Sequence, residues 1–253
     1  MINIKRTFVA LSVMALALIA GSCEKDETLY YNNLTMGNIV EGKFISDQGN
    51  TLNVVEQTCT GQLMSLKRAI ILCDVLKQTA GAEKEYDIRL NEFASVLTKD
   101  VISLADADAG EETTISNPIN IEKLWYSGGF LNMGLTNLMH KDSTTKHLVN
   151  LVYHIDEQGR YVFELRHNAY GDVWTTENST LMVINGSYVS FPISELIEGD
   201  SAKLILKWKW YEPVVYGYDY SKTKEMSFEY EWKRTGFEQT PKTLSLKSSS
   251  ELL

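Results

Sequence analysis

Three evenly spaced histidines are the first candidates for chemistry in this sequence. His140, His147 and His154 recur every seven positions, and imidazole is a common zinc ligand. His147 and His154 are an odd number of residues apart, so on one continuous strand they would face opposite sides and would not share an ion. His140 lies in the polar stretch 140–146, which is typical of a loop. We therefore predict no metal site and no cofactor.

The segment 164–172 (ELRHNAYGD) holds a second set of reactive side chains. Glu164, His167 and Asp172 would suit a hydrolase if they met in an open pocket, because acid–base catalysis needs partners within hydrogen-bond reach. The alternative is a strand that leaves its sheet into a turn, with Arg166 paired to Glu164. No GxSxG, HExxH, P-loop or GxGxxG pattern occurs in the chain. We favour the structural alternative and predict that the protein is not an enzyme.

A tyrosine-rich segment, 211–220 (YEPVVYGYDY), is the better candidate for binding. Tyrosine offers a large contact area with a polar tip at low entropic cost, which suits recognition of a protein or a glycan. Trp174, in the polar stretch 171–178, is a second candidate. The competing interpretation is that some of these rings fold back onto the edge of a sheet. The predicted ligand-binding or partner-binding residues are Trp174, Tyr211, Tyr216, Tyr218 and Tyr220.

The N-terminus carries a signal for export and lipidation. Lys5 and Arg6 precede an apolar run of about 14 residues, which is shorter than the roughly 20 that a spanning helix needs. Small residues then lead into Cys23, as in a bacterial lipoprotein box. We predict a signal peptide over 1–22, a fatty-acylated Cys23 that attaches the protein to a membrane, and an acidic and polar tether over 23–37.

Charge and the tether indicate where the protein works. The chain has a formal net charge of -9, and the loss of Lys5 and Arg6 with the signal makes it more acidic still. Phosphates repel such a surface, so we predict that nucleic acid is not a partner. Glu24, Asp26 and Glu27 directly after the cysteine resemble a surface-export signal of Gram-negative lipoproteins. The expected location is the cell envelope, on the outer membrane and exposed at its surface.

The two remaining cysteines leave two alternatives open. Cys59 and Cys73 are 14 positions apart, and an exported protein can keep a disulfide. Cys73 also lies within the apolar run 69–75, where a small buried thiol fits equally well. The sequence does not decide between a disulfide and two free thiols.

The elements that position these side chains are almost all strands, and the fold class is mainly β. Short strand patterns occupy residues 39–55 around the turn signal Asp47-Gln48-Gly49-Asn50. The segment 68–76 is apolar on both faces, as expected of a central strand. Phe93, Leu97, Val101 and Leu104 recur at helical spacing. This pattern predicts an OB-like Greek-key barrel with one short helix over residues 38–116.

After the unpatterned acidic stretch 106–117, the alternation predicts an antiparallel β-sandwich over 117–236 and a mobile tail over 237–253. Turn signals at 156–159 and at Asn185-Gly186 mark expected hairpins. In 202–210 large apolar residues alternate with lysines, and in 225–233 aromatic residues alternate with glutamates. Two such half-buried strands should pair with each other. Trp208 and Trp210 belong to the core by this alternation.

Three ordered motifs resemble one known family. They are PINIEKLWYSGGFLNM at 118–133, VNLVYH at 149–154 and ELRHNAYGD at 164–172, behind YDIRLNEFASVLTKD at 86–100. This order is similar to that of the NigD-like lipoproteins. The resemblance implies an N-terminal OB-type barrel and a C-terminal β-sandwich. It implies no catalytic residues, and the origin of the family name in a bacteriocin gene cluster suggests an immunity-like role.

The sequence therefore leaves two functions open. The first is a lipid-anchored, non-enzymatic envelope protein that binds a protein or glycan through loops of its C-terminal sandwich, with bacteriocin immunity as one version. The alternative is an accessory glycan-binding lipoprotein of a polysaccharide-uptake system. The identity of the partner and the oligomeric state are not encoded in any motif.

Overall fold

A computed structural model describes residues 35–234 and 242–243 of the chain. The predicted signal peptide, Cys23 and nearly all of the predicted tether lie outside the described residues. The predicted tether reaches residue 37, whereas the first strand, β1, already begins at Thr35. None of the helices in the described part is long and apolar enough to cross a membrane.

The N-terminal part is a closed five-stranded barrel with the order β1-β2-β3-β5-β4. Its side chains with no exposed surface include Phe44, Leu52, Ile71, Cys73 and Ile88. The predicted hairpin turn at 47–50 is confirmed, because β2 pairs antiparallel with β3 and Gly49 has a φ of 79°. The strands are β1 (Thr35–Val40), β2 (Lys43–Ser46), β3 (Thr51–Gln57), β4 (Arg68–Gln78) and β5 (Glu85–Ser95), with a 3-10 turn η2 at Leu63–Ser65.

The helix that the spacing predicts between Phe93 and Leu104 is wrong. Phe93 ends in β5 and packs against the barrel core, Leu97 starts β6, and Val101 packs against the sandwich. The helical spacing of these residues does not mark one buried face, because Phe93 and Val101 pack in different bodies and Leu97 is exposed. The short helices lie further on, as α2 (Leu104–Asp108) and α3 (Glu111–Thr114).

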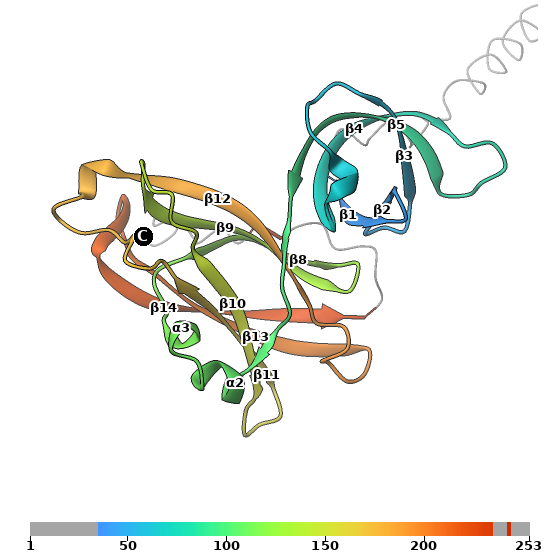
Figure 1. The fold of residues 1–253 in the computed structure, drawn as a ribbon. Helices are drawn as coiled ribbons and strands as arrows, with labels where there is room; N and C mark the ends of the chain where they lie inside the picture. The colour runs from blue at the N-terminus through green and yellow to red at the C-terminus, as the bar shows by residue number, and fades with distance from the viewer. Residues whose placement is uncertain (1–34, 235–241, 244–253) are drawn as a thin grey trace, which may run out of the picture.

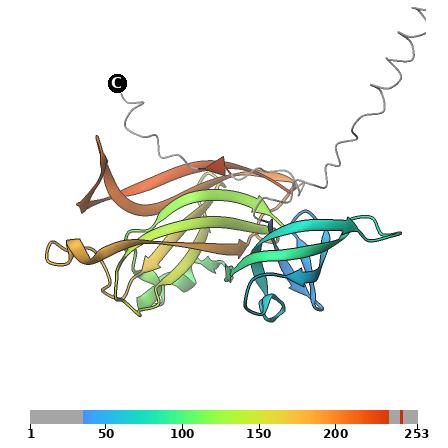
Figure 2. The same ribbon diagram turned by 90° about the horizontal axis from the view of Figure 1, so that it is seen from above.

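The remaining described residues, from Leu97 onward, form a β-sandwich of two five-stranded sheets. One sheet has the order β14-β13-β11-β10-β7 and the other β15-β8-β9-β12-β6. Figures 1 and 2 show the barrel standing at one end of the sandwich. The strands are β6 (Leu97–Thr98), β7 (Ile102–Ser103), β8 (Asn120–Ser127), β9 (Phe130–His140), β10 (Leu148–Ile155), β11 (Tyr161–Asn168), β12 (Met182–Pro192), β13 (Ser201–Val214), β14 (Gly217–Lys233) and β15 (Lys242–Thr243), with η3 at Ser179–Leu181.

Residues 97–103 belong to the sandwich rather than to the barrel. β6 pairs parallel with β12, and β7 pairs parallel with β10. The boundary predicted between residues 116 and 117 therefore lies about 20 residues too late, because local composition does not reveal which sheet a two-residue strand joins. The sandwich also contains a parallel β11–β13 pair within its mostly antiparallel sheets.

Three expectations about individual segments have different outcomes. The predicted pairing of residues 202–210 with 225–233 is confirmed, with Lys203 opposite Glu231 and Lys209 opposite Glu225. The hairpin predicted at Asn185-Gly186 is wrong, since both residues lie inside the unbroken strand β12. The predicted mobile tail is wrong at residues 242–243, which form β15 against β8.

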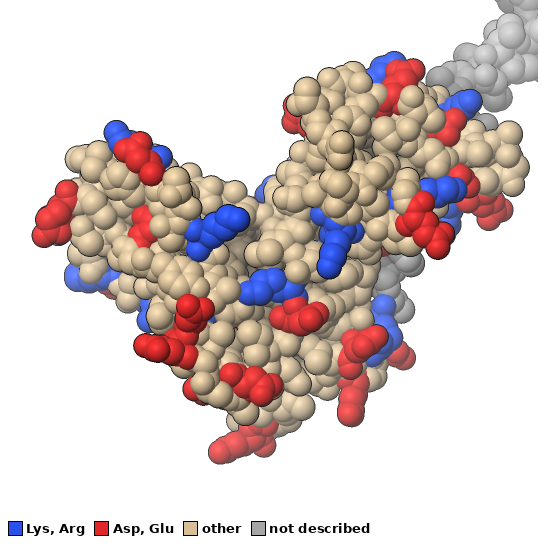
Figure 3. Space-filling model, in the orientation of Figure 1, with Lys and Arg blue, Asp and Glu red and all other residues tan. Residues whose placement is uncertain are grey.

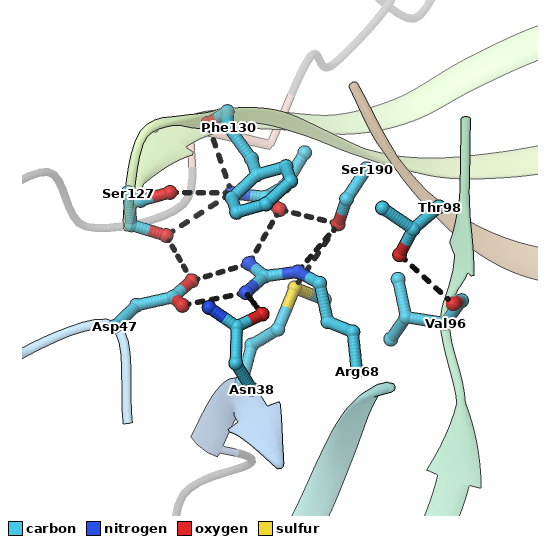
Figure 4. Close-up of polar contacts among 10 residues, drawn as sticks. Asn38, Asp47, Arg68, Val96, Thr98, Ser127, Phe130 and Ser190 are labelled. Carbon is cyan, nitrogen blue, oxygen red and sulfur yellow. Dashed lines mark hydrogen bonds and ion pairs between the residues drawn. The ribbon is translucent and has the colours of Figure 1, made fainter. Parts of the chain in front are cut away.

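A buried arginine joins the barrel to the sandwich (Figure 4). Arg68 of β4 is 2% exposed and all five of its N–H groups are bonded. It donates to Asp47 at 2.8 and 2.6 Å and to Asn38 at 2.9 Å within the barrel. Across the interface it donates to Asn132 of β9 and to Ser190 of β12, both at 2.9 Å.

Further contacts close the cluster around Arg68. Ser127 Oγ donates to Asp47 Oδ2 at 2.6 Å, and Ser190 Oγ donates to Asn132 Oδ1 at 2.6 Å. The guanidinium also lies 4.4 Å from the centre of the Phe130 ring. Beside this polar cluster, Met36, Ile70, Val96 and Trp125 form a small apolar core with Tyr188 packed against it. The two bodies are therefore joined by both polar and apolar contacts.

Candidate functional site

The candidate site is an aromatic groove at the sandwich, where the β11–β12 connection meets the β13–β14 hairpin. Its volume is about 460 Å³. Trp174 and Tyr220 lie with ring centres 6.4 Å apart and planes tilted by 33°, which gives an extended aromatic surface rather than a face-to-face stack. The lining residues are Asn117, Pro118, Val173, Trp174, Thr175, Thr176, Glu177, Tyr211, Tyr220, Ser221 and Thr223.

Tyr211 supports the aromatic surface from below. It is 4% exposed and meets the Tyr220 ring edge-on, with centres 5.0 Å apart. Burial raises the pKa of Tyr211 to about 12, although a hydrogen bond with the backbone of Trp174 opposes that rise. The hydroxyl therefore stays protonated and ties the two sides of the groove together.

The loop that carries Trp174 is braced by a single asparagine. Asn178 Oδ1 accepts the Thr175 N–H at 2.7 Å, and Asn178 Nδ2 donates to the Val173 carbonyl at 2.9 Å. Hydrogen bonds from its own N–H and from Thr175 lower the pKa of Glu177 at the rim. This rim bears a carboxylate and several hydroxyls, and no Lys or Arg is among the lining residues.

The structure separates the five predicted binding residues into two groups. Trp174, Tyr211 and Tyr220 meet at the groove. Tyr218 is half-buried against Trp210, with ring centres 5.6 Å apart. Tyr216 is 95% exposed at the tip of the β13–β14 hairpin. Trp208 and Trp210 are core residues, as the alternation predicts.

A pair of histidines lies behind the groove. His167 Nε2 is 3.0 Å from His147 Nδ1, and His147 Nε2 is 3.2 Å from Asp172 Oδ2. His167 Nδ1 is 3.0 Å from the carbonyl oxygen of Pro118, a residue that also lines the groove. We call His147, His167 and Asp172 the histidine cluster.

Burial and charge set the protonation of this cluster. Burial, followed by the neighbouring His147, lowers the pKa of His167 to about 4. Burial works to raise the pKa of Asp172, but hydrogen bonds from Ser143, the His140 N–H and His147 outweigh it and leave the pKa below its ordinary value. Asp172 is therefore a carboxylate beside a neutral His167 at neutral pH.

The Nδ1 atom of His147 has two competing hydrogen-bond partners, His167 and Asn137. The Pro118 carbonyl only accepts, so neutral His167 carries its proton on Nδ1 and presents a lone pair on Nε2 to His147. Asn137 Nδ2, which donates, lies 2.9 Å from the same His147 Nδ1. When His147 Nδ1 carries a proton, it donates to His167 Nε2. When Nδ1 has a lone pair instead, it accepts a hydrogen bond from Asn137 Nδ2.

The residue set proposed for a hydrolase does not converge. Glu164 lies on the opposite face of β11 from His167 and is paired with Arg166 at 3.0 Å, as the structural alternative predicts. The hypothesis of a hydrolase that uses Glu164, His167 and Asp172 is therefore wrong. Among residues 35–234, no group of His, Cys, Asp and Glu has the arrangement of a metal site.

Sequence reasoning missed the role of His147, although a signal was present. The turn at 156–159 fixes the β10–β11 register, which places Val149 opposite His167. His147, two residues before Val149, is then within reach of His167.

The structure decides between the two alternatives for the other cysteines. Cys59 and Cys73 are free thiols, and Cys73 is buried. Burial raises the pKa of Cys73 to about 11.

Comparison with known proteins identifies the sandwich. Residues 102–221 match the family model described as the NigD-like C-terminal beta sandwich domain. No curated protein matches the sequence.

Several solved structures share the fold. A NigD-like immunity protein from Bacteroides caccae has 19% identity and a TM-score of 0.56, with 78% of this chain and 95% of that chain covered. A putative toxin related protein from Parabacteroides distasonis has 20% identity and a TM-score of 0.54, with 80% of this chain and 94% of that chain covered.

A putative lipoprotein from Bacteroides fragilis has 16% identity and a TM-score of 0.53, and the match covers 80% of this chain and 97% of that one. At these identities the likeness concerns the fold, and it extends over barrel and sandwich together. The match over 102–221 begins close to where the chain enters the sandwich, and it includes the histidine cluster and every lining residue of the groove except Thr223. The chain therefore contains a NigD-like C-terminal β-sandwich domain, and the resemblance to the NigD-like family indicated by its sequence motifs is confirmed.

Proposed function

We propose that the protein is a lipid-anchored, non-enzymatic binding protein of the cell envelope that holds a neutral glycan in its aromatic groove. The observation that carries this proposal is the surface formed by Trp174 and Tyr220 above a buried Tyr211. Sugar rings have apolar C–H faces that pack on aromatic rings, and hydroxyls that pair with a small number of well-placed polar groups.

The rim of the groove favours a ligand without negative charge. Asn117, Thr175, Ser221 and Thr223 offer hydrogen-bonding groups of both kinds around the rings. Glu177 is the only charged residue among the lining residues, and it would repel a phosphate or an acidic sugar. The braced Trp174 loop reduces the entropy lost on binding, because the aromatic surface is formed in advance.

The anchor is the second part of the proposal. The export signal and Cys23 support acylation, and one protein of the same fold is titled a putative lipoprotein. An outer-membrane position exposed at the surface agrees with the acidic residues after Cys23. Mass spectrometry of the native product tests this part, since we expect a chain that starts at an acylated Cys23. An unprocessed, unacylated chain would contradict the anchor.

Binding to polysaccharides tests the groove. We expect retention of the wild-type protein on at least one neutral polysaccharide, and we expect Trp174→Ala and Tyr220→Ala each to weaken binding by at least about tenfold. Tyr216→Ala is the matched control, because Tyr216 is exposed at the tip of the hairpin and does not line the groove. Unchanged retention of the Trp174 and Tyr220 variants would contradict the proposal.

A second function is capture of a protein, as in bacteriocin immunity. It is favoured by the hairpin tip, where Val215 and Tyr216 are 70% and 95% exposed, and two proteins of the same fold are titled an immunity protein and a putative toxin related protein. Here Tyr216→Ala should weaken binding to an envelope protein or toxin, while Trp174→Ala should not. The same three variants therefore separate the two functions.

A further inference from the structure

The sandwich has four sheet edges, and three of them are protected against pairing with another strand. β14 bears Lys224, Glu225, Glu229 and Glu231, all of them exposed. β8 carries Glu122 and Lys123 and is partly covered by β15. At β10, β7 pairs with Val152 and Tyr153, and Lys99 Nζ donates to the Val149 carbonyl at 2.9 Å. Charges and short covering strands are the usual devices against edge-to-edge association.

In the described part of the chain, the Met182–Tyr188 portion of the β12 edge has none of these devices. This segment contains no charged residue and no proline, and its pairing with β9 is regular throughout. β6 covers β12 only at Val189 and Ser190. Val183 is 44% exposed and Ile184 is 67% exposed. An uncharged, regular and apolar edge of this kind is a template for another strand.

The register shows which backbone groups are available for pairing. The Ser190 carbonyl accepts the Lys99 N–H at 3.2 Å, so Ser190 points its backbone groups away from β9. In an antiparallel strand every second residue does the same. Ile184 and Gly186 therefore direct both N–H and C=O to the open side, where no strand lies beside them in the described part of the chain.

A notch between barrel and sandwich leaves room beside this edge. Its volume is about 620 Å³, and its lining includes Leu66, Val96, Leu97 and Tyr188. Figure 3 shows the notch open to solvent between the two bodies. In Figure 1 β12 borders the sandwich on this side. A strand added along β12 would have its end in the notch.

We propose that β12 pairs antiparallel with β12 of a second copy of this chain, about a two-fold axis at Asn185. In this register Ile184 lies opposite Gly186 of the second copy, and each pair exchanges two backbone hydrogen bonds. The exposed Ile184 side chain covers a residue that has none, and Met182 faces Tyr188 near the notch.

A second copy is the occupant that this segment fits, because the segment is uncharged and can pair with itself about a two-fold axis. The chain has a net charge of -9, so two copies repel each other in most orientations. Among the described sheet edges of the sandwich, the Met182–Tyr188 segment is long and uncharged. Two copies can meet there without like charges facing each other. The same segment supplies both strands, as a closed two-fold interface requires. The proposal does not depend on a ligand in the groove.

Sedimentation velocity of the full chain in mild detergent tests the dimer. We expect a monomer–dimer equilibrium, and we expect Ile184→Lys to raise its dissociation constant by at least about tenfold, because the new charge would be buried unpaired at the interface. Ile155→Lys is the matched control, since Ile155 is the same residue type and is 57% exposed on another strand. A monomer at every concentration, or equal effects of both substitutions, would overturn the proposal.

A cysteine at the axis tests the register. Opposed residues of a non-hydrogen-bonded antiparallel pair have Cα atoms about 4.5 Å apart, within the range of a disulfide. Asn185→Cys should therefore form a cross-linked dimer in air, whereas Ser187→Cys, whose opposite residue is Val183, should not. Both variants retain the native cysteines, which gives them a common background. Equal cross-linking of both, cross-linking of neither, or cross-linking to a different protein would overturn the two-fold pairing.

Discussion

The Arg68 cluster and the histidine cluster are both buried and polar, but they are built from different polar groups. Every N–H group of the Arg68 guanidinium is bonded. The histidine cluster instead relies on two imidazoles and one carboxylate. The support behind the groove therefore depends on the protonation of His167, whose pKa burial lowers to about 4, whereas the joint between barrel and sandwich, among the described residues, contains no imidazole.

The two clusters also differ in what they connect. The Arg68 cluster joins residues from β1, β4, β9 and β12 (Figure 4), so it fixes two bodies that are far apart in the sequence. The histidine cluster joins the end of β9 to the loops before β10 and after β11. One cluster maintains the architecture, and the other holds the loops that frame a binding surface. Three substitutions test this contrast.

The largest effect is expected at Arg68. Arg68→Met leaves Asp47 buried without its partner, so the free energy of unfolding should fall by about 3–5 kcal/mol. Urea denaturation measures this loss. The matched control is Arg89→Met, because Arg89 pairs with Glu56 at 2.6 Å while its side chain is 40% exposed, and such surface pairs contribute less than about 1 kcal/mol. Similar losses in the two variants would contradict the assigned role of the cluster.

The next effect is a pH dependence at His167. The unfolded chain binds a proton at this residue below pH 6.5, whereas the folded chain does so only near pH 4, because the folded pKa is about 4. Stability from this group is therefore complete above pH 6.5 and is lost as the pH falls toward 4, by about 3 kcal/mol.

Unfolding measured from pH 7 to 4 should show a shallower loss in His167→Gln than in the wild type. His154→Gln controls for removal of an imidazole outside the histidine cluster, since His154 is half-buried on β10. If His167→Gln and the wild type lose stability in parallel, the pH sensitivity lies elsewhere.

The smallest effect is expected at the turn that contacts the Arg68 cluster. Gly128 has a φ of +59°, and a Cβ there would approach Asp47 Oδ1 to 2.5 Å. Gly159 also has a positive φ, of +74°, but nothing lies within 4 Å of its would-be Cβ. Gly159→Ala should cost about 1 kcal/mol for the backbone alone, and Gly128→Ala should cost about 1 kcal/mol more because Asp47 must move. Thermal unfolding compares the two, and equal costs would show that the turn does not press on the cluster.

Sequence patterns predicted those features of the fold that depend on which side of a strand is buried. The alternation of tryptophans with lysines in β13 and of aromatic residues with glutamates in β14 fixed both the pairing and the register, since one slip would turn every aromatic residue to solvent. The pairing of Arg166 with Glu164, which the sequence also favoured, is present at 3.0 Å. The groove was predicted in part, because tyrosine content indicates a contact surface but not which rings meet.

Longer-range features left no local pattern. Arg68 and Ser190 are 122 residues apart, so the start of an apolar strand gave no hint of an interface. The Asn185-Gly186 pair predicts a turn when only its neighbours are considered. In the structure the strand continues, because all eleven residues of β12 pair with β9. Gly128 and Gly129 form the β8–β9 turn, and Gly128 lies against Asp47 of the barrel, a contact that no local pattern indicates.

The segment from Leu97 to Ser103 has a mechanical consequence. Directly after the barrel the chain contributes one short strand to each layer of the sandwich, first β6 beside β12 and then β7 beside β10. Tension applied from the barrel side therefore loads one layer through β6 first, and the other layer through β7 only after β6 has separated. A fragment that begins at residue 117 would lack one border strand in each layer, so separating the two halves of this protein at that point would damage the half that carries the groove.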